Sequence, residues 1–179
     1  MDDRYPWFES AHGSDLQQGD LLTGCPILRP AFSATAGNTT VQVNVSHAAG
    51  IILTQSCDLA MRADGQCHSK EVLFCPVYSR GELANHPVFG RRAAWEEARK
   101  GRMPSYHVLN RCEVTDRERD FMLVDFSQVF TVDVAVIREL ARRQERRLRL
   151  LPPYREHLAQ AFARFFMRVG LPVDIPPFR

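Results

Sequence analysis

The chain has 179 residues, of which 45% are hydrophobic and 25% charged, with 11 Pro and 10 Gly. This composition is typical of one ordinary soluble domain and argues against a disordered, fibrous or membrane-spanning protein. A net charge of +2 is too small to imply nucleic acid or an acidic membrane as the partner by itself. A single domain over residues 1–179 can bury a stable core without disulfides or metal, so we expect no metal and no cofactor.

Charge is divided unevenly along the chain. Residues 138–179 contain ten Arg and four acidic residues, a balance of +6, so residues 1–137 carry −4. The N-terminal sequence MDDRYPWFESAHGSD is acidic and lacks the apolar stretch of a secretion signal. No apolar run approaches the roughly 20 residues that cross a bilayer. We therefore expect a cytoplasmic protein with no membrane partner.

Strands are predicted over most of the first 132 residues. Residues 41–45 alternate between valine and polar side chains, which is typical of a half-buried strand. The segment Ile51–Thr54 is apolar on both faces, so we expect a central strand with residues 72–77 as its neighbour. Because proline cannot donate to a sheet, Pro76 predicts that this neighbour ends there or lies at an edge. Two further predicted strands cover residues 106–109 and 122–125.

Helices are predicted at three places. Residues 90–101 form a short amphipathic helix with Trp95 and Ala98 on one side. Asp133 is expected to cap a second helix at its N-terminus. The apolar side of that helix contains Val134, Ile137, Ala141, Leu148 and Leu151. The last helix begins at Pro153 and ends before Gly170. Its apolar stripe, which we interpret as core with a dimer face as the alternative, contains Tyr154, Leu158, Ala161, Phe162, Phe165 and Val169.

These elements predict an α+β fold that is mainly β. We expect one domain with two parts. A strongly curved, mostly antiparallel sheet that closes into a small β-barrel covers residues 14–132 and contains the short inserted helix. A C-terminal helical module, residues 133–179, packs on this sheet with two helices.

The polar run after the central strand is the first candidate site. Thr54, Gln55, Ser56, Cys57 and Asp58 follow directly on a buried strand, and strand ends are where sites are often built. Cys57 is a nucleophile if a nearby cation lowers its pKa, and the candidates for this cation are His47, His68, His86 and His107. Asp58 can act as a base, orient a histidine or cap a turn. The plainer interpretation of Cys57 is a small buried residue with an inert thiol.

A zinc site is the weaker interpretation of the cysteines. Its ligands would come from Cys57, Cys67, His68 and Cys75, with Cys25 as a further candidate. Structural zinc sites use pairs of cysteines two to four residues apart, and this spacing is absent here.

The second candidate site is a group of five arginines on the predicted helix after Asp133. They are Arg142, Arg143, Arg146, Arg147 and Arg149. Such a face can neutralise several phosphates of a nucleic acid. Because Glu139 and Glu145 lie among the arginines, a solvated face or a protein contact is the alternative.

Several of these features together resemble the PemK/MazF-like toxin family. Gly19-Asp20 precedes a strand, the central strand ends in Thr54-Gln-Ser56, and Val124–Asp133 leads into a helix. The resemblance covers roughly residues 16–140 and implies a small SH3-like barrel, endoribonuclease activity, and a dimer neutralised by an antitoxin. Thr54 matches the Thr/Ser that the family has after this strand. The family's catalytic arginine has no match, because the chain has Ser46-His-Ala-Ala-Gly50 at that place.

Two functions follow as hypotheses. The first is a non-catalytic binding or scaffold module of a bacterial toxin–antitoxin-like or defence system, with a partner protein, a second copy of itself or nucleic acid as its ligand. The second is an endoribonuclease-like or Cys57-dependent enzyme that uses Asp58 and a histidine. The unmatched arginine favours the first. A histidine or arginine within hydrogen-bond reach of Cys57 or Asp58, in an open cleft, would favour the second.

Overall fold

A computed structural model of the chain describes residues 5–35, 38–112, 114 and 120–167. Eight strands form in this part of the chain: β1 (Phe8–Ala11), β2 (Asp20–Thr35), β3 (Asn38–Ile52), β4 (Glu71–Ser79), β5 (Tyr106–Leu109), β6 (Met122–Asp125), β7 (Phe130–Asp133) and β8 (Arg147–Leu150). The helices are α1 (Ser56–Leu59), α2 (Arg92–Arg99), α3 (Val134–Arg143) and α4 (Tyr154–Phe166). Among these, no helix has the length and hydropathy that a membrane span requires.

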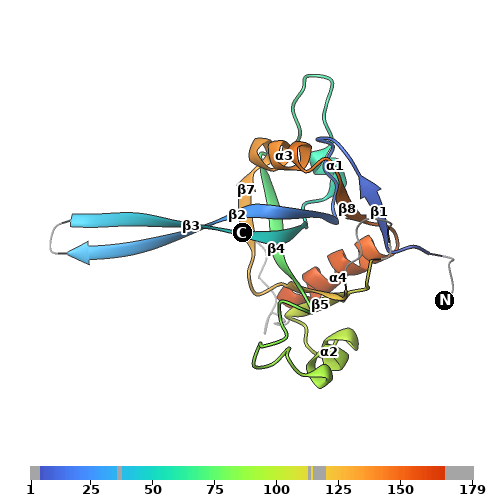
Figure 1. Ribbon diagram of the computed structural model, residues 1–179. Helices are drawn as coiled ribbons and strands as arrows, with labels where there is room; N and C mark the ends of the chain where they lie inside the picture. Colours follow the sequence, from blue (N-terminus) through green and yellow to red (C-terminus); the bar gives the residue numbers. More distant parts are fainter. Residues whose placement is uncertain (1–4, 36–37, 113, 115–119, 168–179) are drawn as a thin grey trace, which may run out of the picture.

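The strands form one antiparallel sheet in the order β1-β8-β2-β3-β4-β6-β5, with β7 alongside β4 (Figure 1). This confirms the α+β, mainly β class. The terminal strands β1 and β5 of this order do not pair within the described residues, so the sheet is not closed. It also extends beyond residues 14–132, because β1 and β8 are part of it.

The helix predicted after Asp133 is shorter than expected. Asp133 caps it as predicted, with its carboxylate accepting a hydrogen bond from the Ala135 amide at 2.7 Å. The helix ends at Arg143, and residues 147–150 form β8, which pairs with β1 and β2. The sequence Arg-Leu-Arg-Leu has the two-residue period of a strand. Leu148 and Leu151 also continue the apolar side of a helix, so the sequence alone favours a longer helix.

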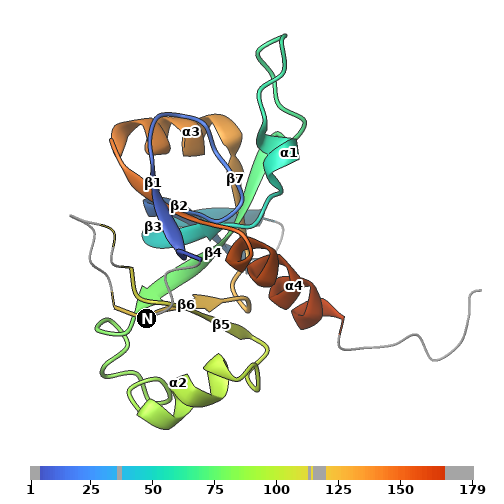
Figure 2. The same cartoon turned by 90° about the vertical axis from the view of Figure 1, so that its right-hand side faces the viewer.

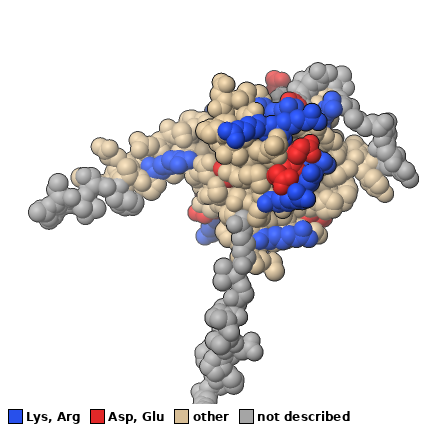
Figure 3. Space-filling model, turned by 90° about the horizontal axis from the view of Figure 1, so that it is seen from below, with Lys and Arg blue, Asp and Glu red and all other residues tan. Residues whose placement is uncertain are grey.

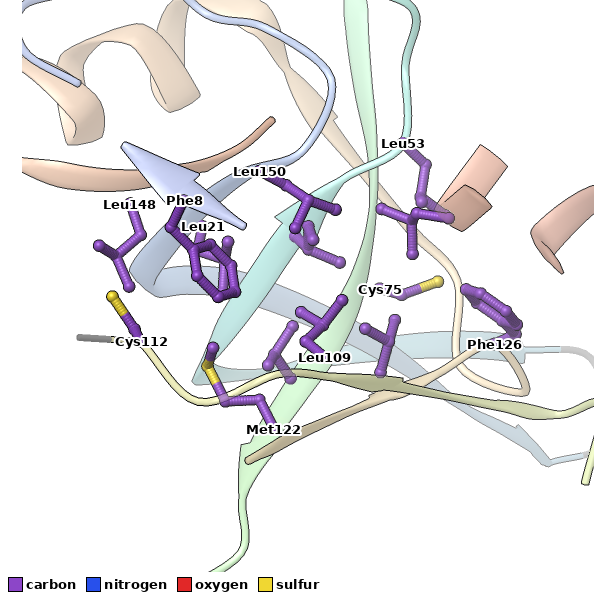
Figure 4. Packing of buried hydrophobic residues seen from close by; sticks show 14 residues of the cluster. Phe8, Leu21, Leu53, Cys75, Leu109, Cys112, Met122, Phe126, Leu148 and Leu150 are labelled. Atoms are coloured by element: carbon purple, nitrogen blue, oxygen red, sulfur yellow. The ribbon is translucent and has the colours of Figure 1, made fainter. Parts of the chain in front are cut away.

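The central strands bury side chains on both faces, as predicted from Ile51 and Ile52. Ile51 and Cys75 belong to the cluster that packs against α4, whereas Ile52 and Phe74 belong to the cluster that packs against α3. The two helices therefore cover opposite faces of the sheet (Figure 2). Figure 4 shows the α4-side cluster, to which β1, β2 and β8 contribute Phe8, Leu21 and Leu148.

The predicted core stripe of α4 is present as far as the structure describes it. Leu158 is fully buried, and Tyr154, Ala161, Phe162 and Phe165 pack partly buried against the same cluster. Val169 and Gly170 lie outside the described residues. A separate small cluster with Phe89 and Trp95 holds α2 at the far end of the sheet.

Pro76 does not end β4 or place it at an edge. The strand runs from Glu71 to Ser79 and has neighbours on both sides. Its pairing with β7 ends at Phe74, and its pairing with β6 begins at Val77. Pro76 lies in this interruption, where a missing N–H costs no ladder hydrogen bond.

One part of the sheet projects from the body. Beyond Ile27, the hairpin of β2 and β3 extends away from the rest of the molecule (Figure 1). We call residues 28–35 and 38–45 the arm. Over this length the only strand that pairs with either arm strand, within the described residues, is the other one.

Candidate functional site

The polar run covers the end of the turn after β3 and the first three residues of α1. Thr54 joins this turn to β4, because its hydroxyl accepts a hydrogen bond from the Leu73 amide at 2.7 Å. The Ser56 hydroxyl accepts one from the Gln18 amide at 3.1 Å. Gln18 also donates from its side chain to the Leu53 carbonyl at 2.8 Å. Two of the five polar side chains therefore hold the turn in place rather than face a ligand.

Cys57 is exposed, which corrects the expectation of a buried thiol. Its sulfur lies 3.7 Å from the Gln55 side-chain oxygen and 3.9 Å from an Asp58 carboxylate oxygen. Both neighbours are electron-rich, and a thiolate is stabilised by cations instead. In the described part of the chain, no histidine or arginine side chain hydrogen-bonds to Cys57 or Asp58. The turn thus has exposed polar groups that can bind, and within the described residues its thiol has no hydrogen bond to a cation that would stabilise the thiolate.

The four candidate histidines have no hydrogen bond to Cys57 within the described residues. His47 is on β3, His68 hydrogen-bonds to Arg62, and the His86 ring accepts hydrogen bonds from the Val88 and Phe89 amides. His107, which is on β5, stacks on the Phe126 ring. Burial, together with the smaller effect of repulsion from His157, lowers the pKa of His107 to about 4.

The five arginines do not form one helix face. Arg142 and Arg143 are exposed on α3, and both pair with Glu139, at 2.8 and 2.7 Å. Their hydrogen bonds lower the pKa of Glu139 to about 2. Arg146 is exposed beyond the end of the helix.

Arg147 and Arg149 are buried in β8 and share the buried carboxylate of Asp20. The Asp20 oxygens lie 2.8 Å from Nε of Arg147 and 2.6 Å from Nε of Arg149. We call these three residues the buried ion cluster. Both guanidinium groups also donate to the Asp15 carbonyl. The cluster therefore holds the loop before β2, from which Gln18 reaches the polar turn, and these two arginines are not available to a nucleic acid.

The cysteines of the zinc interpretation do not come together. Cys25 packs in the cluster on the α3 side of the sheet and Cys75 in the cluster on the α4 side. Burial raises the pKa of each of these thiols to about 12. Within the described residues there is no group of three or more His, Cys, Asp and Glu side chains that could hold a metal ion.

The feature that our sequence interpretation missed is the apolar face of the arm. Leu28 pairs with Val45 and Pro30 with Val43, and directly paired residues share a face of the sheet. Val41, Val43 and Val45 are 53, 55 and 57% exposed. The predicted strand at 41–45 is present, but neither of its faces is buried, because all five residues are exposed. The alternation of valine with polar residues was the available signal, and it did not show that this face would be left uncovered.

Comparisons with family models, with curated proteins and with solved structures found no match to this chain.

Proposed function

We propose that this chain is a non-catalytic binding module and that its arm binds the arm of a second copy of the chain. The observation that carries this proposal is the exposed apolar face of Leu28, Pro30, Val41, Val43 and Val45. A two-stranded ribbon that projects into water is marginally stable by itself, and alternating exposed valines make it an interaction surface.

The edge of β3 supports the same conclusion. Exposed sheet edges in proteins are usually protected by charged residues or proline, because an unpaired strand recruits other strands. Residues 38–49 contain no Lys, Arg, Asp, Glu or Pro. The β2 side of the arm does carry such residues, Arg29 and Pro30. The apolar face and the β3 edge are therefore open to the same partner.

A second copy fits this surface because the apolar face carries no charge that would select a partner of opposite sign. Two such faces cover each other around a two-fold axis. Leu28, Val41, Val43 and Val45 are each a little over half exposed, so covering them contributes roughly 1 kcal/mol per side chain. Eight side chains contribute roughly 8 kcal/mol, which exceeds the lower end of the range of about 4–15 kcal/mol that association costs by about 4 kcal/mol. This surplus corresponds to a Kd of about 1 mM. We therefore expect a reversible dimer.

The environment of Cys57 supports binding rather than catalysis. Its neighbours are an amide oxygen and a carboxylate, and the family's catalytic arginine has no match. The resemblance to PemK/MazF-like proteins implies the wider setting. In this proposal the open sheet is a variant of their SH3-like barrel, and the dimer works in the cytoplasm of a bacterium, in a toxin–antitoxin-like or defence system.

Sedimentation equilibrium over a dilution series tests the dimer. We expect the wild-type chain to dimerise and Val43→Lys, which places a charge on the apolar face, to be monomeric. Gln42→Lys is the matched control, because it adds the same charge on the opposite face of the same strand, and it should dimerise as the wild type does. Two results would overturn the proposal: a wild-type chain that stays monomeric at about 1 mM, or equal dimerisation of the two variants.

A further inference from the structure

A second surface lies at the opposite end of the sheet from α1, between α2 and the ends of β4, β5 and β6. A hollow of about 330 Å³ is lined there by Arg80, Arg92, Trp95, Glu96, Arg99, Val108 and Phe121. Its size is at the lower end of the range for small-molecule sites, about 300–1,000 Å³. Figure 3 views the molecule from the α2 side and shows basic side chains gathered on this face, with acidic ones among them.

The helix presents one face to this hollow. Residues 92, 95, 96 and 99 are spaced by three and four positions, so they lie along one side of α2. Arg80 comes from the opposite wall, where its backbone amide donates to the Phe121 carbonyl at 3.0 Å. The hollow thus joins an apolar floor of Trp95, Val108 and Phe121 to arginines from two different elements.

The charges of the hollow leave two arginines available. Arg99 is paired with Glu96, at 2.8 Å. Within the described part of the chain, the side chains of Arg80 and Arg92 have neither an ion pair nor a hydrogen bond, and both residues are exposed. Guanidinium groups bind phosphate through paired, charge-assisted hydrogen bonds. Arg92 does lie near enough to Glu96 to contribute to lowering the pKa of that carboxyl, after the larger effects of Arg99. Three arginines against one carboxylate beside an apolar floor therefore favour a ligand with a phosphate at one end.

The floor favours a flat ring at the other end of the ligand. Trp95 is held rigidly, because its indole N–H donates to the Phe89 carbonyl at 2.7 Å and its ring packs against the Phe89 ring. Trp95 is 8% exposed, so a base contacts only the small exposed part of its ring, and the partly exposed Val108 and Phe121 supply the rest of the floor. A fixed floor of this kind loses little entropy when a base packs on it. The Arg111 guanidinium lies over the Phe121 ring, 5.6 Å from its centroid, and this contact helps to hold the ring in place.

We propose that this hollow binds a nucleoside monophosphate, with Arg80 and Arg92 on the phosphate and the base against Trp95 and Phe121. We propose a free nucleotide as the ligand. The phosphorylated end of a nucleic acid strand has the same chemistry, so the experiment has to distinguish these two ligands. This site is independent of the arm, so a failure of either proposal leaves the other unaffected.

Isothermal titration calorimetry at low salt, with AMP, GMP, CMP and UMP as probes, tests the site. We expect binding of at least one of them, and binding weaker by about tenfold or more in Arg92→Gln and in Arg80→Gln, since a charged hydrogen-bond partner is lost. The matched control is Arg91→Gln, because Arg91 adjoins Arg92 in sequence but lines a different hollow. Its affinity should stay within about twofold of the wild type. The corresponding nucleoside, which lacks the phosphate, should also bind more weakly by about tenfold or more.

The Trp95 indole N–H signal in the proton NMR spectrum provides a second measurement. It should shift on titration with the nucleotide, and it reports in each variant whether the floor of the hollow is intact. The proposal is overturned if none of the four nucleotides binds at about 1 mM, or if Arg91→Gln weakens binding as much as Arg92→Gln. Binding of a 5′-phosphorylated RNA oligonucleotide through Arg92, without binding of the free nucleotides, would also overturn it and assign the site to nucleic acid ends.

Discussion

Replacing Asp20 by asparagine removes the carboxylate that two buried guanidinium groups share. The Asp20 oxygens accept hydrogen bonds from Arg147 at 2.8 Å, from Arg149 at 2.6 and 3.1 Å, and from the Gln17 amide at 3.1 Å. Asp20 is completely buried and Arg147 is 2% exposed, so solvent cannot replace the lost charge. Breaking such a pair by removing one partner costs about 3–5 kcal/mol.

This loss is a large fraction of the roughly 5–15 kcal/mol by which domains are stable. In urea unfolding followed by circular dichroism, a slope of roughly 2 kcal/mol/M lowers the midpoint of Asp20→Asn by roughly 1.5–2.5 M. Arg147→Met should cost less than Asp20→Asn, because it leaves Asp20 and Arg149 as a neutral pair. Asp64→Asn is the control, since Asp64 is exposed and its carboxylate accepts only a local hydrogen bond from the Gln66 amide.

The reasoning would be refuted by an Asp20→Asn protein as stable as Asp64→Asn. It would also be refuted if Arg147→Met cost more than Asp20→Asn, because the two positive charges would then not depend on the carboxylate. The comparison separates the two interpretations of Arg147. A surface arginine that binds phosphate contributes little to stability, whereas a member of the buried ion cluster contributes a great deal.

Two further predictions concern Gly19 and His107. Gly19 has φ +86°, and a Cβ there would lie 2.9 Å from the Leu150 Cβ, whereas Gly13, with φ +69°, has open space around it. Thermal or urea unfolding should therefore show Gly19→Ala to be less stable than Gly13→Ala by about 1–3 kcal/mol, and equal losses would contradict the packing argument. His107 has a pKa of about 4 in the folded protein against 6.5 as its ordinary value. Between these values the unfolded chain binds a proton that the folded chain does not, so stability falls by up to about 3 kcal/mol as the pH drops from 6.5 to 4. The loss of stability between pH 6.5 and 4 should be smaller in His107→Phe and unchanged in His47→Gln, because His47 is exposed. An unchanged loss in His107→Phe would show that burial of the His107 ring is not its cause.

Local pattern alone determined several elements. The strands at 106–109 and 122–125 have the predicted bounds, the two-sided burial of Ile51 and Ile52 follows from their apolar run, and the carboxylate of Asp133 caps α3. These features depend on side chains close together in the chain, where hydrophobic period and capping chemistry operate directly.

Only the tertiary structure decided the role of the arginines. The four residues Arg-Leu-Arg-Leu are too short to distinguish a helical from a strand period, and their partner Asp20 is 127 residues away from Arg147. Pairing with β1 and β2 settled the choice. Once Asp20 is buried beside β8, the two guanidinium groups must follow it, because an unpaired buried carboxylate is far less stable.

The sequence could not predict either of the two proposed surfaces, and the physical reason is the same for both. Alternating valines at 41–45 indicate a strand, but whether their face is covered depends on what packs above it, and in the described residues nothing does. The spacing of Arg92, Trp95 and Arg99 places them on one face of a helix, and the sequence is enough to show this. The hollow exists only because Arg80, which follows β4, and Phe121, which precedes β6, lie opposite that face. Period and charge are properties of the chain, whereas an uncovered face and a lined hollow are properties of how its elements pack.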